Sequence, residues 1–94
     1  MSERIYVGMK PHERDALGEK TRSRIVEDLG IGMVNAIRTA TAYTINAQLS
    51  ESELEEIARG PLTDPIIQDY TINQTFFEDF DWLVEVGFLP GVTD

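Results

Sequence analysis

The residues that could carry out chemistry are few, and their spacing fits no familiar catalytic arrangement. His12 is the single histidine, and with Glu13 and Asp15 beside it a weak metal site is conceivable. One imidazole cannot build a closed site with such neighbours, so a solvated turn is the favoured interpretation. The sequence contains no cysteine, which excludes disulfides, thiolate metal sites and thiol nucleophiles.

Two acidic segments could suggest cation binding. Four glutamates gather at positions 51, 53, 55 and 56, at the start of a predicted helix. The helix dipole favours carboxylates there, so a solvated face is the simpler explanation. The run from Glu78 to Asp81 lacks the glycine and the spacing of a calcium loop. No serine has a recognisable histidine context and no phosphate-binding glycine loop is present, so we predict no catalytic, cofactor or metal residues.

The composition predicts one small, acidic, folded domain. The chain has 94 residues, 41% of them hydrophobic, and a formal net charge of −9. That charge opposes phosphate backbones and anionic membranes, so neither nucleic acid nor a membrane surface is an expected partner. The opening residues form no apolar signal core and no apolar run approaches membrane length, so the expected location is the cytoplasm.

The first half of the chain predicts a strand, a helix and a strand. Residues Arg4–Lys10 alternate between apolar and polar, which is typical of a half-buried strand. Asp15 is a good N-cap for a helix over Ala16–Leu29, which Gly30 would end. We expect a second strand at Met33–Thr39, although its alternation is poor.

The second half predicts a strand, a helix and a strand again. A tight turn near Ala40 would lead into a strand at Ala42–Gln48. Ser50 and Glu53 form a capping box for a helix that ends near Arg59, before a Gly-Pro pair. A fourth strand is expected at Tyr70–Thr75.

This order, βαββαβ, predicts an α+β fold of the ferredoxin-like type. Its antiparallel sheet would carry both helices on one face. The other face would then need cover from the chain's own tail or from a second copy.

The tail contains an unusual concentration of apolar residues. Residues 82–89 alternate, but apolar side chains fall on both sides, which indicates an extra C-terminal strand buried on both faces. Whether the aromatic residues of the tail form a partner surface or plain core stays open. The candidate oligomer or partner interface comprises Phe76, Phe77, Phe80, Trp82, Val84, Val86 and Phe88.

The end of the chain also repeats its beginning. Residues 7–15 and 86–94 share Val, Gly, Pro and Asp at four of nine positions, and the strand alternation upstream stays in phase. A strand followed by a proline and a helix N-cap is a common local sequence pattern, so a chance match is the alternative explanation for the repeat. If the repeat is real, residues 1–78 are one α+β unit and residues 79–94 begin a second, truncated one.

These segments carry a resemblance to a known family. The chain resembles the small PurS subunit of phosphoribosylformylglycinamidine (FGAM) synthase and, more strongly, the PurS-like N-terminal region of long synthetase chains. The resemblance rests on residues 4–11 with Asp15 and Gly18, on residues 63–70, and on residues 80–82 and 85–94. Stand-alone PurS subunits usually end soon after the fourth strand, whereas this chain continues to Asp94.

The resemblance implies a fold that pairs through its sheet, as a dimer or tetramer, and a role in purine biosynthesis. The family's enzyme moves ammonia from glutamine to an ATP-activated formylglycinamide ribonucleotide. The small subunit performs none of that chemistry and bridges a PurL-type synthetase and a PurQ-type glutaminase. The alternative function is a free-standing, small-molecule-binding regulatory module of ferredoxin-like fold.

Overall fold

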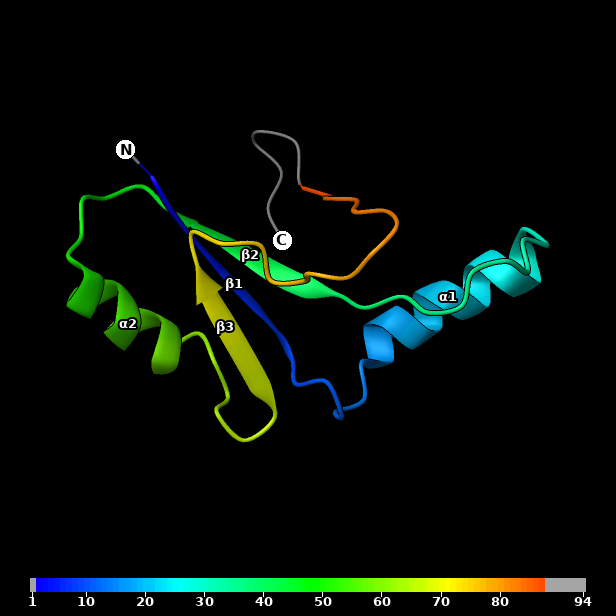
Figure 1. Cartoon of the computed structure of the whole chain (residues 1–94), viewed down its shortest axis with the longest axis horizontal. Coiled ribbons are helices and arrows are strands. Elements are labelled where there is room, and N and C mark those ends of the chain that lie inside the picture. The colour runs from blue at the N-terminus through cyan, green and yellow to red at the C-terminus, as the bar shows by residue number, and fades with distance from the viewer. Residues whose placement is uncertain (1, 88–94) are drawn as a thin grey trace.

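The first strand is the centre of the sheet on which the fold is built. The computed structural model describes residues 2–87, and its strands are β1 (Glu3–Met9), β2 (Ala40–Ile45) and β3 (Gln68–Ile72). β1 lies in the middle and pairs antiparallel with both neighbours (Figure 1). The predicted α+β class, an antiparallel sheet with two helices, is confirmed.

The core lies between one face of this sheet and helix α2 (Glu51–Arg59). Alternation along β1 directs Ile5 and Val7 to that face, where they are buried against Leu54 and Ala58 of the helix. Partly buried side chains surround these four. Most of the apolar burial that stabilises the described part of the chain is therefore concentrated under α2.

The start of α2 is stabilised as its sequence predicts. The Glu53 amide donates to the Ser50 hydroxyl at 3.2 Å, and the Ser50 amide donates to the Glu53 carboxylate at 2.9 Å. This reciprocal pair satisfies two of the amides that a helix leaves free at its first turn. The hydrogen bond from the Ser50 amide is the main reason that the pKa of Glu53 lies below its ordinary value.

Helix α1 (Ala16–Asp28) extends away from the sheet (Figure 1). Its predicted limits are confirmed within one residue, and Gly30 follows it with a φ of 68°. Among its own residues only Gly18 is buried. The prediction that both helices cover one face of the sheet is wrong for α1, because its partner is the returning chain and not the sheet.

That returning chain is the segment expected to be a strand over Met33–Thr39, and this prediction is wrong. The segment runs beside α1 without strand pairing, and β2 begins only at Ala40. The Arg22 guanidinium donates to the Val34 carbonyl at 2.8 Å. A Cβ on Gly18 would lie 2.2 Å from the Ile37 carbonyl oxygen, so the missing side chain is what allows this approach. We call α1 and the returning segment, residues 16–39, the arm.

Asp15 joins the arm to the sheet. Its buried carboxylate caps α1 by accepting from the Gly18 amide at 2.8 Å. It also accepts from the Thr39 amide at 2.5 Å and from the Thr39 hydroxyl at 2.8 Å. Burial alone would raise the pKa of Asp15, but the hydrogen bonds from Thr39 and Gly18 outweigh it and lower the pKa.

The expected C-terminal strand is not formed in its described part. Residues 82–87 have no strand assignment, because no neighbouring strand lies beside them to complete a ladder, and residues 88 and 89 fall outside the described residues. After β3, Asn73 adopts a left-handed backbone with a φ of 54° and donates its amide to the Arg4 carbonyl at 2.7 Å. This turn sends the tail back across the sheet.

Replacing Gly18 by alanine should destabilise the arm although alanine favours helices. The added Cβ would displace the Ile37 backbone, and overpacking of this kind costs about 1–3 kcal/mol. Gly32→Ala is the matched control, because open space surrounds Gly32. Urea unfolding followed by circular dichroism measures both variants, and equal stabilities would show that the close approach is unimportant.

Asp15→Asn should lower the free energy of unfolding at neutral pH by about 1–3 kcal/mol, since it removes charged hydrogen bonds at a cap. The pKa of Asp15 is lower in the folded state. Its carboxylate therefore stabilises the fold at pH values above the unfolded pKa of about 3.9. This contribution disappears as the pH falls through the folded pKa. Unfolding curves of both proteins should therefore converge in acid, and a constant gap would contradict the assignment.

Candidate functional site

The face of the sheet opposite α2 is crossed by the tail. Phe76 lies against Gly8 of β1, where a Cβ would come within 2.7 and 2.9 Å of two ring carbons of the phenylalanine. Phe77 packs on Phe76 in an edge-to-face arrangement, with ring centroids 5.0 Å apart. Gly8 thus provides the hollow in which the tail is anchored.

A second contact holds the tail at the other end of β1. The Arg4 guanidinium donates to the Glu85 carboxylate at 2.5 Å and lies 5.4 Å from the centroid of the Tyr6 ring. Glu85 keeps 62% of its side-chain exposure, so solvent screens the pair and its contribution is small. The tail is therefore firmly placed at Phe76 and weakly placed at Glu85.

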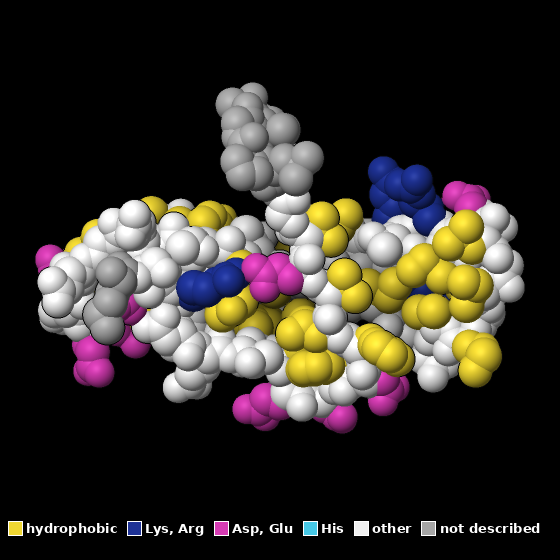
Figure 2. All heavy atoms as spheres, turned by 90° about the horizontal axis from the view of Figure 1, so that it is seen from above, with side chains coloured by type: hydrophobic (Ala, Val, Ile, Leu, Met, Phe, Trp, Pro, Cys, Tyr) yellow, Lys and Arg dark blue, Asp and Glu magenta, His cyan; other side chains and the backbone are white. Residues whose placement is uncertain are grey.

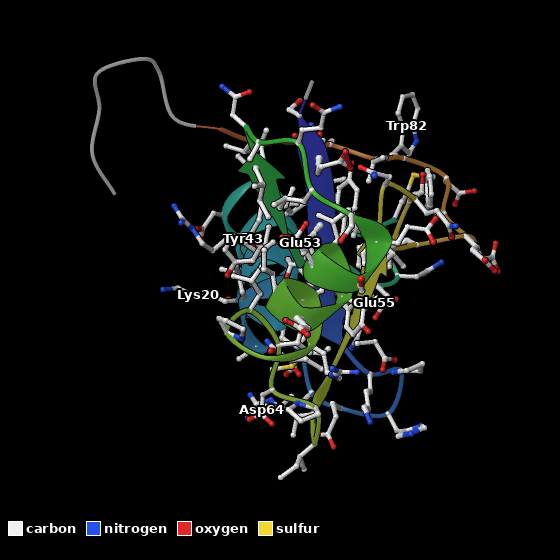
Figure 3. The ribbon with its side chains drawn as sticks, turned by 90° about the vertical axis from the view of Figure 1, so that its left-hand side faces the viewer. Lys20, Tyr43, Glu53, Glu55, Asp64 and Trp82 are labelled. Carbon is white, nitrogen blue, oxygen red and sulfur yellow. The ribbon has the colours of Figure 1, made fainter. Side chains whose placement is uncertain are left out.

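The predicted interface residues fall into two groups. Phe76 and Phe77 are half-buried on the sheet. Beyond them the side chains are exposed, and in Figure 3 the Trp82 ring points away from the ribbon. The exposed fractions are 45% for Phe80, 88% for Trp82, 78% for Val84 and 88% for Val86. Phe88 lies outside the described residues.

The arm presents a second exposed apolar surface, which no sequence prediction identified. Large side chains at its base and tip remain in solvent, and Figure 2 shows hydrophobic side chains gathered over this end of the molecule. The residues are Leu17, Leu29, Ile31 and Met33, with exposed fractions from 49% to 90%. The exposure follows from the arm's direction away from the sheet, which the helical pattern alone does not reveal.

The residues considered for chemistry are dispersed. His12 lies exposed in the turn after β1, and Asp15 serves as the helix cap. Of the four glutamates, Glu53 belongs to the capping box and Glu55 accepts from the Tyr70 hydroxyl, which raises the pKa of that tyrosine. Within residues 2–87 no group of three or more His, Asp or Glu side chains could hold a metal ion.

One depression of the described surface is open and lined by both positive and negative side chains. It follows β3, and its lining includes Arg38, Arg59, Asp69 and Glu78. Arg38 is already engaged, since its guanidinium donates to the carbonyls of Lys10 and Glu13 at 3.1 Å. A lining with both charges and one occupied arginine offers no focused site for a single ligand class.

Neither helix of the described chain is long and apolar enough to cross a membrane. The surfaces that stand out are the tail and the arm, which are both apolar and exposed. Contiguous exposed apolar surface is characteristic of sites that bind other proteins. These features define a small α+β module with two exposed apolar surfaces.

Comparison with known proteins agrees with this class. The family model of PurS, described as phosphoribosylformylglycinamidine (FGAM) synthase, matches residues 2–75. The chain therefore belongs to the PurS family, a family of subunits of FGAM synthase in purine biosynthesis. A search among curated proteins finds no match.

Solved structures of the family have the same fold. PurS of Methanocaldococcus jannaschii is 25% identical and superposes with a TM-score of 0.64, covering 77% of this chain and 92% of that one. PurS of B. subtilis (17% identity, TM-score 0.66) covers 77% and 94%. The purS subunit from Thermotoga maritima (17% identity, TM-score 0.57) covers 77% and 87%. The family match ends at residue 75, directly before Phe76.

Gly8→Ala should loosen the tail without unfolding the sheet. The new methyl group would come closest to the Phe76 ring, which is the flexible side of the contact, and would lie 3.2 Å from the Ala40 Cβ of β2. We expect chymotrypsin to cleave the tail several-fold faster, since released segments are cut more readily. Gly87→Ala, in open space, is the matched control. Equal cleavage rates in both variants would show that Phe76 does not anchor the tail.

Proposed function

We propose that the chain is a non-catalytic component of FGAM synthase that joins a PurL-type synthetase to a PurQ-type glutaminase in the cytoplasm. The observation that carries the proposal is the family match over residues 2–75, which includes the sheet and both helices. Family membership supports a place in the complex. The bridging role itself is our inference from the chain's surfaces.

The physical support for bridging is the position of the two exposed apolar surfaces. The arm leaves one end of the sheet, whereas the tail crosses the face opposite α2 (Figures 1 and 2). The separation of these surfaces would let one module contact two proteins at once. Self-assembly into a dimer or tetramer belongs to the same proposal, because a core confined to one helix leaves much of the sheet without cover.

A free-standing, small-molecule-binding module is not favoured. The family match gives the chain a place in an enzyme complex, and the open, mixed-charge depression along β3 does not resemble a ligand pocket.

Reconstitution with the two catalytic components tests the bridging role. Adding the chain to synthetase and glutaminase should raise the glutamine-dependent rate several-fold, since it would bring the two active sites together. The rate with saturating ammonium should stay unchanged, because free ammonia needs no bridge. A rate that responds equally with both nitrogen sources, or with neither, would contradict the proposal.

A further inference from the structure

The described end of the tail has the sequence of a central strand but not its surroundings. Val84, Val86 and Gly87 repeat the spacing of Ile5, Val7 and Gly8 in β1. In β1 the two apolar side chains are 0% and 4% exposed. In the tail the corresponding valines are 78% and 88% exposed. The same apolar pattern is therefore buried in β1 and exposed to solvent in the tail.

The contacts of the tail within its own chain do not satisfy this pattern. β1 is buried because β2 and β3 flank it and α2 covers one of its faces. Residues 82–87 have no flanking strand, and the contact found for them is the exposed ion pair of Glu85 with Arg4. A pair of this kind is weak and can be exchanged for other contacts.

The sheet offers an unpaired edge of the required kind. β2 pairs with β1 on one side, and its outer side is free among the described residues. Its sequence, Ala-Thr-Ala-Tyr-Thr-Ile, contains no charge and no proline, so it lacks the usual protection against added strands. Tyr43 of this strand is 37% exposed, so part of this margin of the sheet lies in solvent.

We propose that residues 82–87 of one copy add as a strand to the outer edge of β2 in a second copy, and reciprocally. Every copy carries both the strand and the edge, so a two-fold axis satisfies both in a closed dimer. The inner edge of β2 already pairs with the Ile-x-Val pattern of β1. The Val-x-Val pattern of the tail therefore suits the same side-chain spacing along that strand.

Charge also favours another copy of the chain. Residues 76–87 carry four carboxylates and no basic residue. The chain that leads into β2, residues 10–38, holds six of the eight lysines and arginines and five carboxylates, a net charge of +1, whereas α2 carries four glutamates and one arginine, a net charge of −3. Attraction would thus guide the tail toward the arm side of a second molecule, where the β2 edge begins.

This inference deepens the proposed self-assembly by naming the strand and the edge that meet. The tail lies beyond the family match, so the arrangement would be particular to chains with this extension. A dimer that forms by another surface would overturn the inference and leave the bridging role untouched.

Sedimentation of the 94-residue chain over micromolar concentrations tests the pairing. Val84→Pro removes an amide from the tail strand and should weaken dimerisation by roughly tenfold or more. Thr41→Lys places a charge on the β2 edge and should act similarly. Asp79→Pro introduces the same residue in the preceding linker and should leave the dimer intact. Circular dichroism checks that all variants stay folded.

Mixing the two defective variants provides the decisive control. The Val84→Pro protein keeps an unaltered β2 edge, and the Thr41→Lys protein keeps an unaltered tail. In the mixture, the tail of the Thr41→Lys protein can therefore pair with the β2 edge of the Val84→Pro protein. We expect a heterodimer that is weaker than the parent dimer and tighter than either variant alone. A monomeric parent chain, a Val84→Pro protein that dimerises normally, or a mixture without association would each overturn the proposal.

Discussion

The burial of Ile5 and Val7 under α2 is the interaction on which the rest of the structure depends. These residues belong to the central strand, so the same few positions supply both hydrogen-bonded ladders and the floor of the core. β2 and β3 come from distant parts of the chain and meet β1 from either side. Neither outer strand could be held in register without β1, because β2 and β3 do not pair with each other.

A second constraint is polar and acts where the core does not reach. The arm has little apolar burial, so its position depends on Asp15, Gly18 and Thr39. One carboxylate caps α1 and at the same time fixes the residue before β2. Hydrogen bonds of this kind orient the arm without covering it, which explains why its apolar side chains remain in solvent.

Local signals in the sequence predicted local structure well. The capping box at Ser50 and the N-cap at Asp15 each require residues within one turn, and both are present as expected. The alternation of β1 identified its buried face, because a strand pairs each residue with one side of the sheet. These features therefore follow from the sequence without knowledge of the rest of the chain.

Features set by distant partners could not be predicted in this way. Residues Met33–Thr39 contain enough apolar residues to suggest a strand, but the hollow at Gly18 and the donor on Arg22 draw them to α1. The space above Gly8 is filled by Phe76, which is far away in the sequence, so the glycine alone could not predict this contact. The family resemblance supplied the class of protein, while the direction of the arm needed the structure.

The limited size of the core connects these observations to function. One helix covers one face of a three-stranded sheet, so a chain of this length retains more apolar side chains than it can bury. Most of these exposed side chains lie on the arm and on the tail beyond Phe77, with Ile66 before β3 as a further exposed residue. The sheet is common to this chain and its structural relatives, whereas the tail follows the matched region. Because Val84 and Val86 add nothing to the described core, their apolar character is explained only by contacts with another molecule or with residues outside the described part.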